Sequence, residues 1–149
     1  MGLREGQAGA GAPLPKGGTS FISVKESDRP AALEVAQQLE RLGFNIQATS
    51  GTAAYLRDHG VHAESVYKVN EGRPHIVDHI KNGQVALVVN TVRTARSHAD
   101  SLSIRREALN RGLAYYTTIR GARAAVMGIE AILKKELTIR SLQEYHHHL

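Results

Sequence analysis

Short apolar runs alternate with longer segments of helical periodicity from about residue 19 to the C-terminal region. Each apolar run is bounded by polar, Gly or Pro residues, which is the pattern of a buried β-strand. These runs predict strands at Ser20–Val24, Phe44–Thr49, Ser65–Val69, Val85–Asn90 and Leu113–Thr117. Between the runs, apolar residues recur every three or four positions. This spacing predicts helices from an N-cap at Asp28 to Leu42, and over Ser50–Asp58, Pro74–Lys81, Ser101–Asn110 and Gly121–Lys134.

The alternation of strands and helices predicts an α/β fold built on a doubly wound, Rossmann-like, five-stranded parallel sheet. The almost entirely apolar run Val85–Asn90 is typical of a central strand covered on both faces. In such sheets, ligands bind at the carboxyl ends of the strands, near the point where the strand order reverses. The segments after the strands carry hydroxyls, an amide and cations but few carboxylates. They therefore predict an anion site formed from Lys25–Arg29, Thr49–Thr52, Lys68–Arg73, Asn90–Arg93 and Thr117–Arg120.

The run from Lys68 to Gly83, KVNEGRPHIVDHIKNG, places a basic turn directly before a helix. Pro74 suits the first helical position, where the backbone N–H that it lacks would have no intrahelical partner. A helix start exposes unpaired N–H groups, and Lys68 and Arg73 add positive charge beside them. Two interpretations stay open: an anion-binding turn, or a capped helix with two solvated cations.

The 149 residues suffice for one domain with a hydrophobic core. Residues 1–18 are rich in Gly, Ala and Pro, which predicts a flexible linker from a preceding domain. Residues 19–145 are predicted to form the folded domain. Residues 146–149 contain three consecutive histidines and are interpreted as a tail or a tag remnant.

The composition narrows the classes of function. The sequence has no cysteine, which excludes a disulfide framework, a thiolate metal site and a cysteine nucleophile. No apolar stretch approaches the roughly 20 residues of a membrane span, so we expect a cytoplasmic protein without membrane contacts. The net charge of +5 is compatible with nucleic-acid binding, but the arginines are spaced along helices and aromatics make up only 5%, so we expect none. His75 and His79 lack the glutamate of an HExxH motif, so no metal site is predicted.

Six motifs resemble the C-terminal regulatory domain of the carbamoyl-phosphate synthase large chain, in the methylglyoxal-synthase-like fold group: ISVKESD, ATSGT, KVNEGRPHIVDHIKNG, VVNT, SIRREAL and YYTT. The resemblance covers about Thr19 to Glu144 and implies a methylglyoxal-synthase-like fold. It implies a domain that binds effectors without turning over substrate, within a glutamine-hydrolysing, ATP-dependent ligase of arginine and pyrimidine biosynthesis. No cofactor is implied for this domain, whereas the whole enzyme would use ATP and Mg. The implied partners are UMP or IMP as effector, ornithine, the catalytic domains of the same polypeptide, the small glutaminase subunit and possible self-association.

The resemblance also implies site residues, none of them catalytic, by matching positions. One group would hold the phosphate of the nucleotide and consists of Arg29, Thr49, Ser50, Gly51, Thr52 and Lys68. A second group would lie nearer the ribose and base and consists of Asn90, Thr91 and Val92. Tyr115 and Thr117 match positions that help to hold ornithine at the boundary with a neighbouring domain. Arg73 is assigned either to the phosphate or to an interface.

Three positions depart from the pattern of this family. Arg29 replaces an expected lysine and adds a planar fork that can clamp phosphate with two hydrogen bonds. Ser50 stands where histidine is expected and Val92 where threonine is expected, so each substitution removes a polar contact. Losing one hydrogen bond to a charged ligand costs about 1.5–3 kcal/mol. We therefore expect phosphate binding to be kept and the preference for purine or pyrimidine to be open.

The main alternative is a methylglyoxal-synthase-type phosphate lyase on the same fold. That chemistry needs an aspartate in the turn before the middle helix, where this sequence has Arg73, and an arginine cannot act as a general base at neutral pH. A purine-biosynthetic cyclohydrolase shares the SVKxxD and xTxGT patterns, but its KTLH-type segment is absent. A module that only docks against other protein surfaces through the helix Ser101–Asn110 also stays open.

Overall fold

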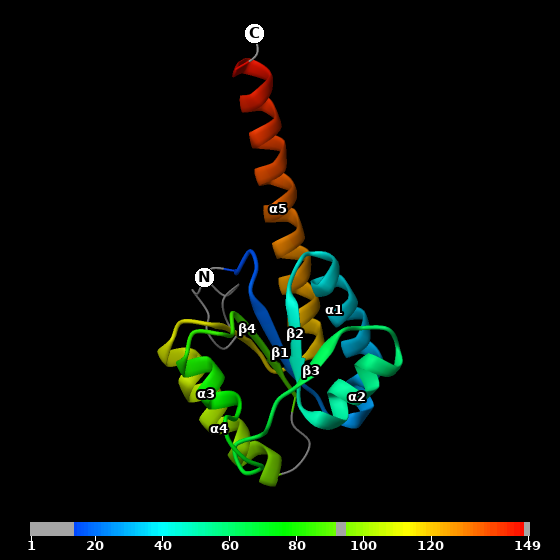
Figure 1. The fold of residues 1–149 in the computed structure, drawn as a ribbon, viewed down its shortest axis with the longest axis vertical. Coiled ribbons are helices and arrows are strands. Elements are labelled where there is room, and N and C mark those ends of the chain that lie inside the picture. Colours follow the sequence, from blue (N-terminus) through cyan, green and yellow to red (C-terminus); the bar gives the residue numbers. More distant parts are fainter. Residues whose placement is uncertain (1–13, 92–94, 148–149) are drawn as a thin grey trace.

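The computed structural model describes residues 14–91 and 95–147 (Figure 1). Five parallel strands form one sheet in the order β3-β2-β1-β4-β5. Their bounds are Thr19–Ser23 for β1, Asn45–Ala48 for β2, Ala63–Ser65 for β3, Leu87–Asn90 for β4 and Ala114–Tyr116 for β5. The predicted doubly wound, five-stranded parallel sheet is thereby confirmed.

Helices cover both faces of the sheet (Figure 1). Their bounds are Arg29–Arg41 for α1, Ser50–Asp58 for α2, Ile76–Lys81 for α3, Ala95–Asn110 for α4 and Ile119–His147 for α5, and a short 3-10 turn, η2, spans Glu26–Asp28. The helices α1, α2 and α5 share one hydrophobic cluster with the sheet, and α3 and α4 share the other. The sheet is therefore the middle of three layers.

Successive side chains of the inner strands belong alternately to the two hydrophobic clusters. On β1, Phe21 packs toward α3 and α4, whereas Ile22 packs toward α1, α2 and α5. On β4, Val88 and Val89 divide in the same way, and all four residues of that strand are buried. An almost unbroken apolar strand is explained by this arrangement because both of its faces are covered.

Three elements differ from the sequence prediction by more than two residues at one end. The third strand was expected at Ser65–Val69 and lies at Ala63–Ser65, because its partner β2 ends at Ala48, which pairs with Ser65. The fourth helix begins at Ala95, six residues before the expected start, and the last helix ends at His147 instead of Lys134. Neither Gly nor Pro interrupts residues 129–147, and Lys, Glu, Leu and Arg are strong helix formers, so nothing stops the last helix earlier.

Residues 14–18, which we expected to belong to a flexible linker, lie against the domain. Leu14 packs on the cluster beneath α5, next to Gly128, and Lys16 forms a salt bridge with Glu136. The Gly18 carbonyl accepts a hydrogen bond from the Asn45 N–H, 2.9 Å away. The domain boundary at residue 18 stays a prediction.

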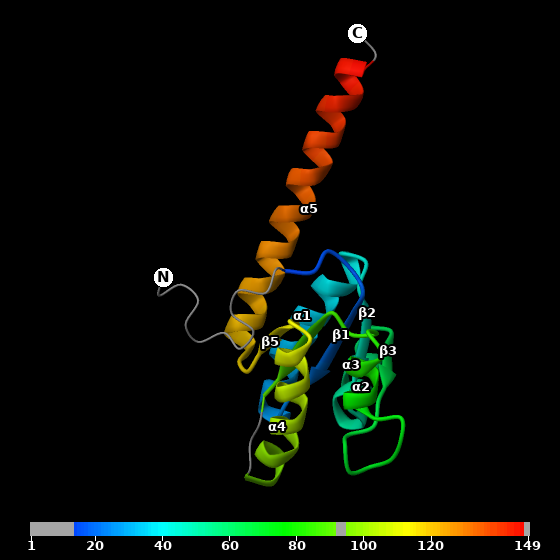
Figure 2. The ribbon, with the colours of Figure 1, turned by 90° about the vertical axis from the view of Figure 1, so that its left-hand side faces the viewer.

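The outer half of α5 projects away from the sheet (Figures 1 and 2). The inner half buries Ala122, Val126 and Ile129 in the core. From residue 134 to residue 144 every described side chain is exposed, including the large apolar Leu137 and Leu142. None of the helices in the described ranges combines the length and the apolar character that a membrane crossing requires.

Removing residues 138–149 is expected to change the free energy of unfolding by less than about 0.5 kcal/mol, because the described side chains in this segment are exposed. The matched substitution in the inner half, Ile129→Ala, is expected to cost about 2–5 kcal/mol, because Ile129 is fully buried. Urea denaturation of both variants would measure the two changes. A loss on truncation as large as that of Ile129→Ala would show that the outer half of α5 packs on the domain.

Candidate functional site

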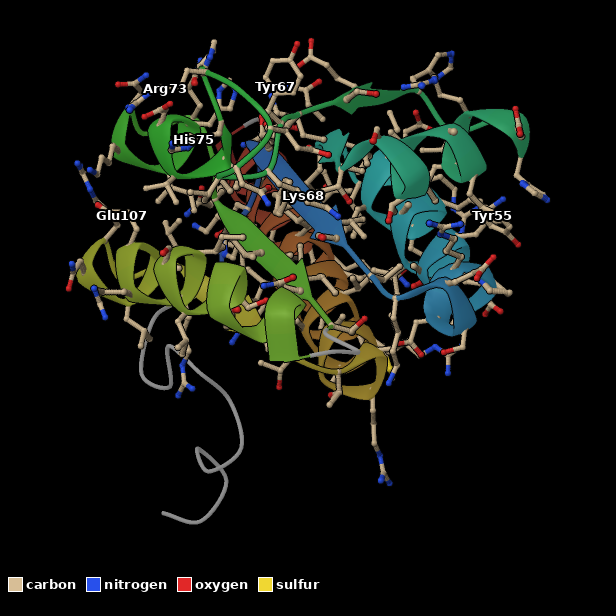
Figure 3. All side chains as sticks on the ribbon, turned by 90° about the horizontal axis from the view of Figure 1, so that it is seen from below. Tyr55, Tyr67, Lys68, Arg73, His75 and Glu107 are labelled. Atoms are coloured by element: carbon tan, nitrogen blue, oxygen red, sulfur yellow. The ribbon has the colours of Figure 1, made fainter. Side chains whose placement is uncertain are left out.

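The carboxyl ends of β1 and β4 form the point where the strand order reverses. After β1 the backbone runs into α1 on one face of the sheet, and α4, after β4, lies on the other face. A crevice between two such neighbouring strands is the usual ligand site of doubly wound sheets. Figure 3 looks onto this edge of the molecule.

Three threonines of the predicted site tie the loop after β1 to its neighbours. The Thr49 hydroxyl donates to the Ser23 hydroxyl at 3.3 Å, and the Lys25 N–H donates to Thr91 Oγ1 at 3.0 Å. The Thr52 hydroxyl lies 3.4 Å from the backbone nitrogen of Val24 and accepts its hydrogen. All three threonines are at most 7% exposed. Their hydroxyls therefore hold the loop in shape, which the sequence-based assignment to nucleotide contacts did not foresee.

Arg29 lies directly against the first turn of α2. Its Nη2 atom is 2.5 Å from the place that a Cβ atom would take at Gly51, so a side chain at position 51 would displace the guanidinium. The Arg29 Nε atom is buried and, within the described part of the protein, has no hydrogen-bond partner. A glycine at this position thus allows a cation to approach the start of a helix.

The start of α2 keeps its positive character because it lacks a side-chain cap. Thr49 is the N-cap residue with extended backbone angles, φ −67° and ψ 157°, but its hydroxyl makes no capping hydrogen bond. The first backbone N–H groups of a helix lack intrahelical partners and carry the positive end of its dipole. Together with Arg29 they form a strongly electropositive point, which favours an anion such as phosphate.

Lys68 and Arg73 come from the same loop but lie in different places. Lys68 is over the middle of the sheet edge in Figure 3, whereas Arg73 is at the outer side near α3. The Arg73 guanidinium contacts the Asp78 carboxylate at 2.6 Å, and its side chain is 74% exposed. Arg73 therefore lies apart from Lys68 in this view, and its charge is engaged with Asp78.

The start of α3 is closed to an anion, which corrects the sequence prediction for this turn. Pro74 is not the first helical residue: it precedes the N-cap residue His75, and α3 begins at Ile76. The His75 N–H donates to Asp78 Oδ2 at 2.9 Å, and the Asp78 N–H donates to His75 Nδ1 at 3.4 Å. This reciprocal capping box places a carboxylate where an anion would otherwise bind. The capping box fits the capped-helix interpretation at the start of α3, and anion binding by Lys68 stays a prediction.

Asn90 lies at the end of β4, with its side chain inside the protein. Its Nδ2 atom is 3.0 Å from both the Ser101 hydroxyl of α4 and the Tyr115 hydroxyl of β5. Tyr115 is only 1% exposed, and this burial raises its pKa. Thr117, which we expected beside Tyr115 at a domain boundary, is exposed. Val92 lies outside the described residues.

A cavity of about 550 Å³ opens beside the start of α2, and sequence reasoning did not find it. Its lining comes from α2, β3, the following loop and α3, and consists of Ser50, Glu64, Ser65, Val66, Tyr67, Glu71, Pro74 and His79. The two glutamates oppose an anion in this cavity. Ser50 is thus the only member of the predicted phosphate group among the residues that line it. Among the described residues, no three His, Cys, Asp or Glu side chains are grouped so that they could hold a metal ion.

Comparison with known proteins identifies a matching family model and similar large chains of carbamoyl phosphate synthase. The family model of the MGS-like domain matches residues 31–117. The carbamoyl phosphate synthase large chain of Myxococcus xanthus (strain DK1622) is 48% identical over 139 residues, which are 93% of this chain and 13% of that protein. The C-terminal section of the same large chain from Aquifex aeolicus (strain VF5) is 46% identical over 143 residues, covering 93% of this chain and 27% of the relative. The chain therefore spans only a small part of the length of these relatives.

Solved structures support the fold. Methylglyoxal synthase from Elizabethkingia anophelis NUHP1 superposes with a TM-score of 0.60 at 16% identity, covering 76% of this chain and 79% of that one. At this level of identity the likeness concerns the fold alone. It agrees with the predicted methylglyoxal-synthase-like architecture.

Asp78→Asn is expected to lower the melting temperature at neutral pH and to make folding less sensitive to acid. The hydrogen bond from the His75 backbone N–H, with a smaller contribution from Arg73, holds the pKa of Asp78 below its ordinary value. A lowered pKa means that the carboxylate stabilises the fold fully above the ordinary aspartate pKa, about 4, and loses this effect as the pH falls through the lowered value. Thermal melts of Asp78→Asn and the parent protein between neutral and strongly acid pH would measure the change in melting temperature.

The exposed Asp58 at the end of α2 offers a matched control, because Asp58→Asn removes the same charge from a site without a capping role. We expect Asp58→Asn to follow the parent protein across the pH range. Identical pH profiles for Asp78→Asn and the parent would contradict the capping role of Asp78.

Proposed function

The chain belongs to the MGS-like domain family, and from this premise we propose that it is a regulatory domain of a carbamoyl phosphate synthase large chain. In this proposal it binds a nucleoside monophosphate at the carboxyl edge of the sheet and turns over no substrate itself. The similarity to C-terminal sections of the large chain, at 46% and 43% identity, supports the first part. The geometry of the edge supports the second.

The observation that carries the proposal is the approach of Arg29 to the uncapped start of α2. A guanidinium beside a helix N-terminus repels it electrostatically unless an anion lies between or beside them. Gly51 makes the approach sterically possible, and the buried Nε atom of Arg29 has a donor to offer. A phosphate monoester supplies both the charge and the acceptor oxygens that this pair of donors requires.

The remaining parts of the nucleotide would lie along the ends of β1 and β4. Lys68 adds a second cation for the phosphate, and Asn90 and Thr91 border the crevice where a ribose would lie. UMP and IMP are the candidate effectors, because the resemblance implies both and because Ser50 and Val92 leave the base preference open. ATP and Mg would be used only by other domains of the whole enzyme.

Regulation requires partners outside this domain. We propose that the domain contacts the catalytic domains of the same large chain and the small glutaminase subunit, and that ornithine binds near Thr117. We also propose self-association and a location in the cytoplasm. Exposed Leu102 and Leu109 on α4 offer apolar surface for such contacts. An effector changes activity only if it binds the two states of the enzyme with different affinity, so these contacts must differ between the states.

Isothermal titration calorimetry of the protein with UMP, IMP and inorganic phosphate is expected to give saturable binding of at least one nucleotide, tighter than phosphate alone. The physical reason is that the nucleotide adds contacts beyond the phosphate. The measurement is made at one fixed salt concentration because the site is electrostatic. Absence of saturable binding by all three would refute the proposal. Release of methylglyoxal from dihydroxyacetone phosphate by the unmodified protein would favour the lyase alternative instead.

Lys68→Ala is expected to weaken nucleotide binding by about tenfold or more, because it removes one charged hydrogen bond to phosphate. Arg73→Ala is the matched comparison: it removes a cation from the same loop, but one whose guanidinium is engaged with Asp78. We expect Arg73→Ala to change the affinity by less than about twofold at constant salt. Equal losses in the two variants would mean that only the total charge of the loop matters, and that Lys68 does not contact the phosphate.

A further inference from the structure

We infer that Tyr115 is a positioning residue of the effector site, which acts on a bound ligand through Asn90 and does not touch the ligand itself. The inference rests on the proposed function, because it concerns the same crevice between β1 and β4. It assigns Tyr115 a role different from the ornithine contact that the resemblance implies.

The contacts around Asn90 carry the inference. The amide of Asn90 is held at one end by two hydroxyls, those of Ser101 and Tyr115, each at 3.0 Å. Asn90, Ser101 and Tyr115 are 4%, 8% and 1% exposed, respectively, so water does not compete freely for these hydrogen bonds. A buried polar group that loses its partner is left with a large desolvation cost, so the three side chains fix one another's positions.

The fixed amide lies next to the part of β4 that borders the crevice. The residue after Asn90 is Thr91, whose N–H donates to the Ser23 carbonyl at 2.9 Å and whose hydroxyl accepts from the Lys25 N–H at 3.0 Å. The end of β4 is therefore attached to the β1 loop through Thr91 and to α4 and β5 through Asn90. A change at Tyr115 alters the support of Asn90 and thus the edge of the site.

Tyr115 itself has no access to a ligand in the crevice. Its ring belongs to the hydrophobic cluster formed with α3 and α4, beside Phe21 and Ile104. Its hydroxyl is directed to Asn90, so a ligand that contacts Asn90 from outside has the amide between itself and the tyrosine. The tyrosine therefore influences binding only by holding the amide.

The neighbouring tyrosine provides a matched control. Tyr116 is also buried, at 4% exposure, and belongs to the same strand. It faces the opposite side of the sheet, in the cluster of α1, α2 and α5, away from Asn90. Tyr115→Phe and Tyr116→Phe each remove one hydroxyl from a buried ring, but only the first removes a partner of Asn90.

The test compares the two variants with the parent protein in calorimetric titrations with UMP, IMP and inorganic phosphate. Tyr115→Phe is expected to weaken nucleotide binding by roughly two- to tenfold, the effect of one uncharged hydrogen bond, and Tyr116→Phe to leave it unchanged. Inorganic phosphate should bind equally well to all three proteins, because it does not reach Asn90. Thermal melts confirm that each variant is folded at the temperature of titration.

A second comparison separates an indirect role from a direct one. In the Asn90→Ala background, Tyr115→Phe is expected to cause no further loss of affinity, because the residue through which it acts is gone. If Asn90→Ala does not fold, the comparison of Tyr115→Phe with Tyr116→Phe decides alone.

The outcomes distinguish the inference from the proposed function. Nucleotide binding by Tyr115→Phe that equals binding by the parent would overturn the inference and leave the proposed function intact. A full further loss in the Asn90→Ala background would also overturn it, since Tyr115 would then act independently of Asn90. If the parent itself binds neither nucleotide, the proposed function fails and the inference fails with it.

Discussion

The parallel pairing of β1 with β4 is the constraint on which the other features of this domain depend. The two strands are joined in register from Ser20 and Leu87 to Ser23 and Asn90, and the backbone leaves them toward opposite faces of the sheet. Their carboxyl ends therefore cannot be covered by their own helices, and polar groups must be satisfied there without a continuing strand. Buried hydroxyls and the Asn90 amide meet this need, so the carboxyl edge of the sheet is lined by hydrogen-bonded polar groups.

The starts of α2 and α3 differ in their electrostatic character. Both α2 and α3 come after a strand of the sheet, and each helix start has a cation nearby, Arg29 of α1 at α2 and Arg73 at α3. At α3 the third helical residue is Asp78, which closes the helix start with its own carboxylate and engages Arg73. At α2 the third residue is Thr52, whose hydroxyl is used by the β1 loop. Of these two helices, only α3 has a side-chain cap at its start, and Arg29 lies against the uncapped start of α2.

The sequence was sufficient for the order of the elements, because this order follows from hydrophobic periodicity and from the geometry of parallel sheets. The site at the carboxyl edge of the sheet stays a prediction. The sequence was insufficient to predict hydrogen bonds for polar groups that have more than one candidate partner. The sequence around Pro74, His75 and Asp78 is compatible with a helix that begins at Pro74 or at Ile76, and tertiary packing decides between the two. The hydrogen bond between Asn90 and Tyr115 was also out of reach of the sequence, because the two residues are 25 positions apart. The length of α5 was underestimated because its outer half has no apolar stripe against the domain, although its helix propensity is high.

Some residues of the candidate site belong to a buried polar framework, and others are exposed. A substitution therefore has a different effect in each group. Thr49, Thr52 and Thr91 belong to the framework, so replacing them would alter the loop after β1 as well as any ligand contact. Ser50, in contrast, is exposed and borders the cavity beside α2, so a change there alters what a ligand touches while the loop keeps its shape. Under the proposed function, a domain built in this way keeps its phosphate contacts when the base that it prefers is exchanged. This is consistent with a serine standing where the resemblance leads us to expect a histidine.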